Sequence, residues 1–273
     1  MEPRSPQVSS GADKAAVGDE VTPEQPRLRR IALPGLPEQT YILESRPVER
    51  LLFGRELVGQ EFARECLLAS LDFCRLLAPR LDTRDVAELL ILNGGRYYGL
   101  ASAYSQVFGR PLPVNEVKAT RRCTADGTWA ADISYRHYVH AAGTLLIGDT
   151  VATGVSARVA LEDFFTFHLP REVVFFTICG GIPGGRVIAE TCARHGVALT
   201  LVFGVAAFGL AENGTDLPFL HPETVTDPRY LERARVVYGG KPVCAIGDWG
   251  ERGEDPATYL ATWAETKRAW GLA

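Results

Sequence analysis

A short segment near the middle of the chain combines a carboxylate, hydroxyl groups and glycine. Residues 145–156 read Leu-Leu-Ile-Gly-Asp-Thr-Val-Ala-Thr-Gly-Val-Ser, an apolar run that leads into a loop of small residues. Gly154 lets the backbone approach a ligand, and backbone N–H groups and hydroxyls can donate to phosphate oxygens. Asp149 can accept hydrogen bonds from ribose hydroxyls. The segment predicts a sugar-phosphate loop, with an ordinary strand-to-helix turn as the alternative.

The loop resembles the phosphoribosyl-pyrophosphate (PRPP) binding motif of type I phosphoribosyltransferases. In that motif, apolar residues lead into two acidic residues and then a Thr-Gly-x-Ser loop. The first acidic position is Gly148 here, whereas the uracil phosphoribosyltransferase branch keeps one acid, at that first position. The resemblance implies a catalytic role for Asp149 at the ribose and a loop that holds the 5-phosphate. Its PRPP-binding residues would be Thr150, Val151, Ala152, Thr153, Gly154 and Ser156.

Paired glycines follow an earlier apolar run. Residues 91–96 read Ile-Leu-Asn-Gly-Gly-Arg, and the matching loop of the uracil branch is Leu-Arg-Ala-Gly. Asn93 replaces the arginine of that loop, which removes a charge-assisted contact and leaves open whether Arg96 substitutes for it. The resemblance implies that Asn93, Gly94 and Gly95 bind pyrophosphate. Taken alone, a double glycine after a strand is a common turn.

An arginine in the next segment is a candidate for the leaving group. Residues 117–122 read Val-Lys-Ala-Thr-Arg-Arg, a polar stretch spans 123–132, and residues 133–138 contain two tyrosines. These segments resemble the family's strand, arginine and flexible β-arm with its return strand. Arg121 falls on the arginine that reaches pyrophosphate, and a guanidinium suits a leaving group that gains negative charge. A solvated side chain is the alternative for Arg121.

The third loop lies near the C-terminus. Residues 245–253 read Ala-Ile-Gly-Asp-Trp-Gly-Glu-Arg-Gly and resemble the base-binding loop of the uracil branch, Gly-Leu-Gly-Asp-Ala-Gly-Asp-Arg. The resemblance implies a catalytic Asp248 that faces the ribose and the water shell of a metal ion. A bulky tryptophan replaces a small residue, so a core aromatic without ligand contact is the alternative for that position. The acceptor-binding residues would be Ala245, Ile246, Gly247 and Trp249.

Residues 215–242 are inserted between two segments that lie close together in the family. We expect this insertion to roof the acceptor pocket and to change the acceptor. Because a pocket built for other polar groups rejects a mismatched ligand, we expect uracil to be a poor acceptor.

The elements that position these loops follow from the periodicity of apolar residues. Three- and four-residue spacing predicts a helix that begins at Pro47 and ends before residues 81–85. Alternating strand and helix patterns then indicate an α/β fold, with a parallel sheet flanked by helices and ligands at the carboxyl ends of its strands. The resemblance implies the type I phosphoribosyltransferase fold with a β-arm and a C-terminal hood. Strands are predicted at 86–92, 115–118, 144–148, 173–179 and 199–207, and helices at 99–108, 155–167 and 185–195.

Composition limits the remaining possibilities. Residues 1–27 are rich in Pro, Ser, Gly, Asp and Glu, which predicts a disordered tail before a single phosphoribosyltransferase domain at 28–273. A net charge of −4 argues against a nucleic-acid partner, and no apolar stretch approaches the roughly 20 residues that span a membrane.

Six scattered cysteines without a C-x-x-C pair predict a reduced, cytoplasmic protein. The five histidines lack metal-ligand spacing. The glycine cluster at 179–185 favours a structural turn over a second phosphate loop.

These features together predict a phosphoribosyltransferase that transfers the 5-phosphoribosyl group of PRPP to an acceptor and releases pyrophosphate. By resemblance the acceptor is uracil or a related pyrimidine, Mg²⁺ is bound through PRPP rather than by a protein-built metal site, and the protein is a homodimer. Two alternatives stay open: a relative that modifies a specialised metabolite, and a non-catalytic PRPP-sensing regulator on the same fold.

Overall fold

The computed structural model describes residues 23–92, 94–124, 129–242, 244–245 and 248–272. Eight strands of these residues form one sheet, and five short strands form two smaller sheets. The strands of the main sheet are β1 Arg27–Arg30, β2 Thr40–Glu44, β3 Val86–Ile91, β4 Val114–Cys123, β5 Trp129–His137, β6 Thr144–Gly148, β7 Glu172–Thr177 and β9 Ala198–Phe203. The short strands are β8 Gly180–Gly181, β10 Ala206–Phe208, β11 Asp216–Leu217, β12 Val225–Thr226 and β13 Cys244–Ala245.

The main sheet has the order β1-β2-β9-β7-β6-β3-β4-β5. Its six inner strands are parallel, and β1 and β5 pair antiparallel at the two edges. The described helices are α1 Arg46–Phe53, α2 Gly59–Leu77, α3 Leu100–Phe108, α4 Val155–Phe165, α5 Ile182–Arg194, α6 Pro228–Tyr238, α7 Asp248–Glu254 and α8 Pro256–Trp270, with 3-10 turns η1 Ala78–Arg80 and η2 Gly95–Tyr98.

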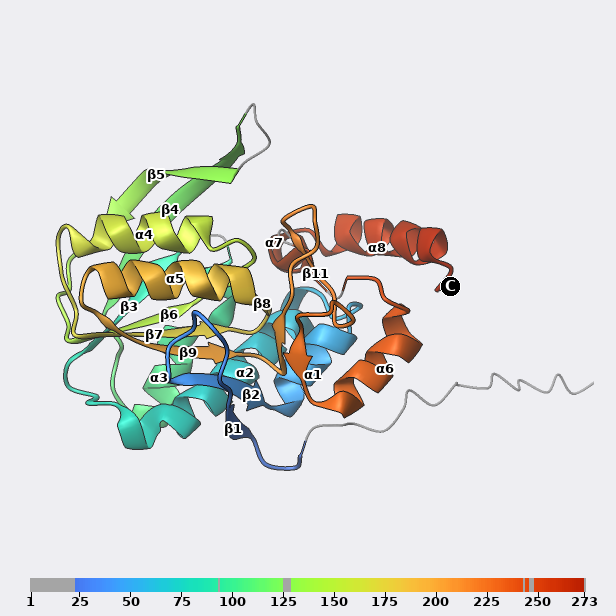
Figure 1. Ribbon diagram of the computed structural model, residues 1–273. Coiled ribbons are helices and arrows are strands. Elements are labelled where there is room, and N and C mark those ends of the chain that lie inside the picture. The colour runs from blue at the N-terminus through green and yellow to red at the C-terminus, as the bar shows by residue number, and fades with distance from the viewer. Residues whose placement is uncertain (1–22, 93, 125–128, 243, 246–247, 273) are drawn as a thin grey trace, which may run out of the picture.

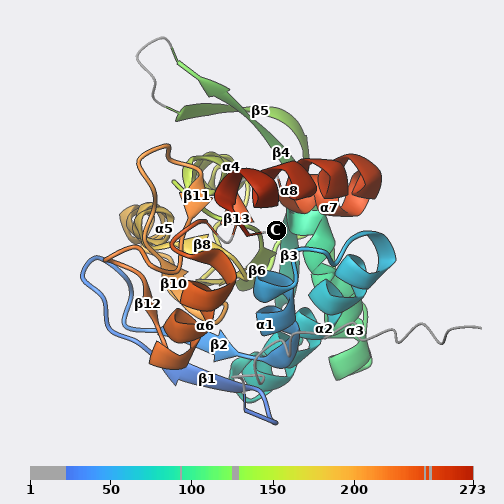
Figure 2. The ribbon, with the colours of Figure 1, turned by 90° about the vertical axis from the view of Figure 1, so that its right-hand side faces the viewer.

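Helices cover both faces of the sheet. Helices α4 and α5 lie on one face, and α2 and α3 lie on the other (Figure 1). Figure 2 looks onto the carboxyl ends of the parallel strands and shows α1, α6, α7 and α8 in front of that edge. The hairpin of β4 and β5 projects away from the sheet (Figure 1). The predicted α/β architecture, a parallel sheet flanked by helices, is therefore confirmed.

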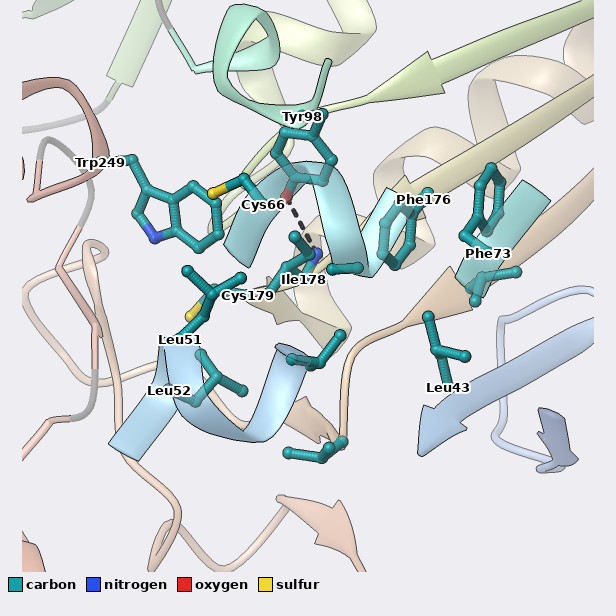
Figure 3. Close-up of a cluster of buried hydrophobic side chains, with 14 of the residues drawn as sticks. Leu43, Leu51, Leu52, Cys66, Phe73, Tyr98, Phe176, Ile178, Cys179 and Trp249 are labelled. Carbon is teal, nitrogen blue, oxygen red and sulfur yellow. Dashed lines mark hydrogen bonds between the residues drawn. The ribbon is translucent and has the colours of Figure 1, made fainter. Parts of the chain in front are cut away.

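Consecutive side chains of the inner strands enter opposite layers of the core. In β7, Val173 and Phe175 join the cluster beneath α4 and α5, whereas Val174 and Phe176 join the cluster on the α2 side. This alternation explains why consecutive residues of β7, from Val173 to Phe176, are all apolar, as expected for a strand covered on both faces. The Phe176 ring stacks on Phe73 of α2 with centroids 4.4 Å apart (Figure 3).

Several predicted boundaries were wrong. The helix predicted from Pro47 is two helices, because the chain leaves helical geometry between Gly54 and Val58 before α2 begins. The strand predicted at 115–118 continues to Cys123 as β4, and the expected return strand is β5, which already begins at Trp129; the two pair from Glu116 with His137 to Cys123 with Trp129, as a β-arm requires. Strand β1 begins within the segment assigned to the tail, and residues 1–22 lie outside the described part of the chain.

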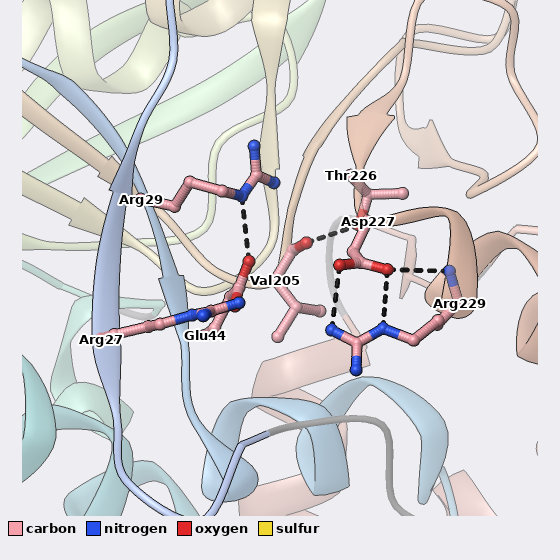
Figure 4. A network of polar contacts seen from close by, with 7 residues as sticks. All are labelled: Arg27, Arg29, Glu44, Val205, Thr226, Asp227 and Arg229. Atoms are coloured by element: carbon pink, nitrogen blue, oxygen red, sulfur yellow. Dashed lines mark hydrogen bonds and ion pairs between the residues drawn. The ribbon is translucent and has the colours of Figure 1, made fainter.

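The edge strand β1 and its inner neighbour β2 were not predicted, since both are short and β1 reads Arg-Leu-Arg-Arg. Glu44 is buried on β2 and accepts hydrogen bonds from Arg27 at 2.6 Å and Arg29 at 2.9 Å. Beside this cluster, Asp227 caps the start of α6 by accepting from the backbone N–H of Arg229 at 2.9 Å (Figure 4). A buried carboxylate is stable only when such donors satisfy it.

Candidate functional site

A cavity of about 410 Å³ opens at the carboxyl edge of the parallel sheet. The segments that follow β3 and β6 form one side, β4 forms a second, and α7 closes the third. Ligands of α/β proteins bind at this edge. Its lining residues are Ile91, Leu92, Gly94, Ala119, Arg121, Asp149, Thr150, Val151, Ala152, Thr153, Gly154, Val155, Ser156, Ala157, Trp249, Gly250, Glu251, Glu254 and Asp255.

The loop between β6 and α4 has the geometry of a phosphate cradle. Gly154 precedes the first residue of α4 with φ +78°, a conformation that L side chains rarely adopt. A β-carbon on Gly154 would also lie 2.7 Å from the carbonyl oxygen of Gly184. The loop therefore presents its backbone and the N-terminus of an 11-residue helix to the cavity.

The glycine cluster at 179–185 packs against the backbone of this loop. It forms β8 and the first turn of α5, and Gly180 bridges Val151 of the cradle. A side chain on Gly184 would meet Val151 and the carbonyl oxygen of Ala152 at 2.4 Å. None of these glycines lines the cavity. The structural interpretation of the cluster is therefore confirmed: its glycines allow two backbone segments to pack in contact.

Asp149 is buried at the start of the cradle, with 7% of its surface exposed. One carboxylate oxygen accepts a hydrogen bond from the backbone N–H of Thr150 at 2.8 Å. Burial raises the pKa of Asp149 to about 7, although that hydrogen bond and the charge of Arg121 oppose the shift. A β-carbon on Gly94 would lie 2.2 Å from the same carboxylate, so the paired glycines pass directly over Asp149.

The structure separates the two neighbouring arginines of β4. Arg121 lines the cavity, and its guanidinium lies 5.6 Å from the centre of the Trp129 ring. Partial burial lowers the pKa of Arg121, and the Asp149 charge counteracts this. Arg122 instead pairs with Asp132 of β5 at 3.0 Å and does not line the cavity. Only Arg121 is placed to meet a ligand at this edge.

Trp249 belongs both to the core and to the cavity wall. It is 2% exposed, stacks on Tyr98 with centroids 5.6 Å apart and meets Phe62 edge-on at 5.1 Å (Figure 3). Trp249 nevertheless lines the cavity. Its packing in the core is observed, and its contact with an acceptor stays a prediction.

Arg252, which ends the acidic motif of the C-terminal loop, has a structural role. Its buried guanidinium donates to the carbonyl oxygens of Leu51 at 3.1 Å, Gly54 at 2.9 Å and Leu57 at 3.0 Å. It also lies 4.5 Å from the centre of the Phe62 ring. These carbonyls belong to the end of α1 and the segment after it, which lack helical partners. Arg252 therefore attaches α7, and with it one cavity wall, to α1.

A second attachment joins α7 to the paired-glycine segment. Arg96 pairs with Glu254 at 3.0 Å, and the Tyr97 hydroxyl donates to the carbonyl oxygen of Gly250 at 3.3 Å. A side chain on Gly253 would overlap the Tyr97 ring, at 2.1 Å. Arg96 therefore holds a carboxylate of α7, and it does not line the cavity.

The structure brings together most, but not all, of the predicted site residues. Gly95 is buried behind the wall rather than in it, because a β-carbon there would meet the carbonyl oxygen of Gly148 at 2.7 Å. Asn93, Ile246 and Gly247 lie outside the described residues, and Ala245 and Asp248 are placed only by their positions in β13 and at the start of α7. The predicted residues that line the cavity are Gly94, Arg121, Asp149, Thr150, Val151, Ala152, Thr153, Gly154, Ser156 and Trp249.

The carboxylates of the rim were missed by the sequence prediction. Four carboxylates line the cavity against one guanidinium: Asp149, Glu251, Glu254 and Asp255, and Arg121. Asp255 also caps α8 by accepting from the backbone N–H of Thr258 at 3.2 Å. The signal was present in the sequence, because Glu251 belongs to the loop motif at 245–253 and Glu254 and Asp255 follow it directly.

The expectation that the insertion roofs this cavity was wrong for the residues that the structure describes. No described residue of 215–242 lines it. Strand β11 of the insertion instead pairs with β13, and α6 packs on α1, where the Tyr238 hydroxyl donates to the carbonyl oxygen of Leu52 at 2.6 Å. The aromatic rings of Tyr230 and Tyr238 stack on Phe53. Through these contacts the insertion packs against α1, away from the opening of the main cavity.

Two further features of the described part of the chain bear on ligands and location. No group of three or more His, Cys, Asp or Glu side chains there is arranged to hold a metal ion. No helix in the same residues is both long and apolar enough to cross a membrane.

Neither a protein-family model nor a curated protein matches this sequence. Among solved structures, the AQ2163 protein from Aquifex aeolicus has a TM-score of 0.50 at 14% identity, over 64% of this chain and 91% of that one. Adenine phosphoribosyltransferase from Leishmania donovani has a TM-score of 0.42 at 12% identity, over 69% and 90%. The Trypanosoma brucei enzyme, in complex with AMP, pyrophosphate and ribose-5-phosphate, has a TM-score of 0.39 at 12% identity, over 76% and 99%.

These similarities concern the fold. The chain shares its architecture with the Aquifex protein, and several of the other similar structures are phosphoribosyltransferases. Identities of this size do not carry an activity or an acceptor from one protein to another, and no special closeness to the uracil branch is shown.

Proposed function

We propose that this protein transfers the 5-phosphoribosyl group of PRPP to a small-molecule acceptor and releases pyrophosphate. The observation that carries the proposal is one cavity wall on which a phosphate cradle, a buried carboxylate and an arginine meet. Asp149 and the cradle at 150–156 that follows it, and Arg121 of β4, come from two separate segments of the chain, and all line the same cavity. This combination suits a ligand with a phosphate, a sugar diol and a second anionic group.

Each part of the wall has a defined task in such a transfer. The backbone and hydroxyls of the cradle, with the N-terminus of α4, would hold the 5-phosphate. Asp149 would accept hydrogen bonds from the ribose hydroxyls when its carboxyl group is ionised. The pyrophosphate would then lie towards Gly94 and Arg121, at the opposite side of Asp149.

The chemistry requires positioning and electrostatics more than proton exchange. The bond from C1 of the ribose to pyrophosphate breaks, a bond from C1 to the acceptor forms, and the proton that a nitrogen acceptor loses is taken up by the departing pyrophosphate. Positive charge develops on the sugar and negative charge on the departing pyrophosphate. Arg121, always protonated near neutral pH, is placed to stabilise the second of these charges.

The charges of the wall fit a Mg²⁺ complex of PRPP. Among the described residues, Glu251 and Asp255 line the cavity in addition to Asp149 and to Glu254, which pairs with Arg96, so the bare anion of PRPP would meet carboxylates of its own sign. Mg²⁺ prefers oxygen ligands and keeps several waters, which these carboxylates could bind. When bound, the ion would neutralise the phosphates and assist departure of pyrophosphate. Glu251 and Asp255 are the carboxylates best exposed for this role.

The proposed activity is tested by pyrophosphate release from PRPP with Mg²⁺ and a panel of nitrogen heterocycles and amines. Release with at least one acceptor is the expected result, and calorimetry should show PRPP binding. Binding without release for any acceptor would favour a PRPP-sensing regulator instead. A folded protein that does not bind PRPP at all would overturn both.

Uracil belongs in the same panel. We expect its catalytic efficiency to stay below about 10⁴ M⁻¹s⁻¹, the lower end of the ordinary enzyme range. The reason is Trp249, whose ring takes up wall space at the position of a small residue in the uracil branch.

We also propose that the β4–β5 hairpin mediates a homodimer. The hairpin projects beyond the sheet (Figure 1), and Tyr135 on β5 is 44% exposed. Sedimentation equilibrium should give twice the mass of the chain, and a protein that remains a monomer at all concentrations contradicts this.

A further inference from the structure

Trp129, the first residue of β5, lies where three segments of the chain meet. The guanidinium of Arg121 on β4 lies 5.6 Å from the centre of its ring. At the edge of the same ring, a β-carbon on Gly214 would lie 3.5 Å from Nε1 of Trp129 and 3.8 Å from Cγ2 of Thr153. The indole therefore lies between the arginine of the main cavity and a turn that also reaches the phosphate cradle.

The register of the hairpin accounts for the contact between the arginine and the indole. Arg121 is opposite Ala131, and Cys123 is opposite Trp129, so Arg121 and Trp129 are diagonal neighbours. Opposite residues, and residues two positions further along either strand, share one face of the strand pair. Diagonal neighbours on one face are within reach of long and aromatic side chains. The pairing of β4 with β5 thus brings the indole to the arginine.

The ring of Trp129 is the contact that orients Arg121. The guanidinium of Arg121 makes no hydrogen bond or ion pair with another residue that the structure describes, and Asp149 acts on it through charge alone. Arg122, by contrast, is held by the carboxylate of Asp132. A guanidinium within roughly 6 Å of an indole centre is attracted to the face of the ring.

An aromatic ring suits this task better than a carboxylate does. A carboxylate would accept hydrogen bonds from the same N–H donors that a phosphate group needs, whereas an indole face attracts the charge without accepting them in this way. We propose that Trp129 is a positioning residue for Arg121, which it holds at the pyrophosphate side of the main cavity with the N–H donors free. The inference rests on the proposed function of that cavity.

The turn at 211–216 limits the movement of the indole. The backbone N–H of Gly214 donates to the carbonyl oxygen of Ala211 at 2.9 Å, and the side-chain oxygen of Asn213 accepts from two further backbone N–H groups at 3.0 and 3.1 Å. Gly214 has φ +71°, which favours glycine at this point of the turn. The turn leads into the insertion, so the insertion acts on the main cavity indirectly, through Trp129.

The first test compares variants of the full chain in pyrophosphate release. Trp129→Leu should lower kcat about fivefold or more, because the attraction to an aromatic face is lost. PRPP affinity should change by less than about threefold, since the effect acts through the charge that develops on pyrophosphate. Trp129→Phe keeps an aromatic face and should recover most of kcat. A kcat as low in Trp129→Phe as in Trp129→Leu would overturn the proposal.

Phe167→Leu is the matched control. The guanidinium of Arg136 lies 5.2 Å from the centre of the Phe167 ring, and neither residue lines the main cavity. This substitution removes a similar contact at another place and should leave kcat as in the unmodified protein. A loss equal to that of Trp129→Leu would overturn the proposal.

A double-mutant cycle shows whether Trp129 acts through Arg121. Arg121→Ala removes the guanidinium, so adding Trp129→Leu to that variant should leave its kcat within about twofold. An equal fold-loss in both backgrounds would mean that the indole acts independently of the arginine, and the positioning role would be overturned.

The contact also has a readout that does not depend on turnover. Ring currents shield a group above an indole face, so the Nε–H signal of Arg121 in NMR spectra should move downfield in Trp129→Leu and stay in place in Phe167→Leu. The signal is identified by its loss in Arg121→Lys. An unmoved signal in Trp129→Leu would overturn the inference while the transferase activity stands. Absence of PRPP binding or of any pyrophosphate release by the unmodified protein would instead count against the proposed function, whatever the NMR signal does.

Discussion

The ring of Tyr98 occupies the space into which a side chain at Gly148 would project. A β-carbon on Gly148 would lie 2.7 Å from Cδ1 of Tyr98, closer than real side chains approach. The ring is held there by a hydrogen bond from the backbone N–H of Ile178 to its hydroxyl at 2.9 Å and by its stack on Trp249 (Figure 3). The glycine at the first acidic position is therefore required by packing.

Restoring an acid at this position should harm the protein. Gly148→Asp is expected to destabilise the fold by about 1–3 kcal/mol through overpacking and a buried charge, with no gain in PRPP affinity. Urea denaturation and PRPP titration measure the two effects. In Tyr98→Ala the space is open, so adding Gly148→Asp to that variant should cost less than it does alone. An equal cost in both backgrounds would show that the ring is not the obstacle.

The buried guanidinium of Arg252 should be important for stability. Arg252→Ala removes three hydrogen bonds to carbonyls near the end of α1, and it leaves the oxygens of Leu51 and Leu57 without this donor, whereas the Gly54 oxygen still accepts from the backbone N–H of Leu57. Each buried group left unsatisfied costs roughly 1–3 kcal/mol, so a loss of about 3 kcal/mol or more is expected in urea denaturation. Arg235→Ala is the matched control, since its exposed pair with Glu232 should contribute less than about 1 kcal/mol. A similar loss in both would contradict the structural role.

The fold was predictable where local pattern and burial agree. The central strands β3, β6, β7 and β9 are mostly apolar, because helices cover both faces, and they lie close to their predicted ranges. The edge strand β1, Arg-Leu-Arg-Arg, has no such run, since its charges are satisfied by Glu44 of the neighbouring strand. That contact is made across the sheet, and no local pattern records it.

The site, like the fold, was predictable where its residues form a local motif and not where distant residues meet. The cradle and Arg121 were found from motifs because their residues are adjacent in sequence or match a resemblance. Arg96 and Glu254 are 158 positions apart in the sequence. The attachment of α7 depends on this contact, so no local motif predicts it. The place of the insertion depends on the pairing of β11 with β13, which a single sequence does not specify.

The raised pKa of Asp149 predicts a pH dependence of stability. A carboxyl group whose pKa rises from its usual value to about 7 on folding binds its proton more tightly in the folded state. The contribution of Asp149 to the free energy of unfolding therefore decreases as the pH rises from about 4 to about 7, because ionisation in the buried site is unfavourable. Asp149→Asn cannot ionise, so the variant should be more stable than the unmodified protein at pH 8, by up to a few kcal/mol.

The difference between the two proteins should shrink towards pH 4. Glu88, also buried with its pKa raised to about 7, contributes equally to both and cancels in the comparison. Urea denaturation at several pH values between 4 and 8 measures the difference. A constant difference would mean that Asp149 does not titrate in this range.

The same substitution should weaken the binding of PRPP. An amide cannot accept from both ribose hydroxyls as a carboxylate does, and a charge-assisted hydrogen bond contributes roughly 1.5–3 kcal/mol. Asp149→Asn should therefore weaken PRPP binding about tenfold or more at pH 8, although the fold is more stable. Calorimetry with PRPP and Mg²⁺ gives the affinity. Unchanged binding by the folded variant would remove Asp149 from the ribose site.

Arg121 and Arg122 provide a matched pair for the leaving group. Arg121 lines the cavity, whereas Arg122 pairs with Asp132 on the outside of the hairpin. If Arg121 stabilises the charge that develops on pyrophosphate, Arg121→Ala should lower kcat more than it weakens PRPP binding. Arg122→Ala should leave both close to those of the unmodified protein. Steady-state kinetics and PRPP titration of the two variants make the comparison, and an equal loss of kcat and affinity in Arg121→Ala would assign the arginine to binding alone.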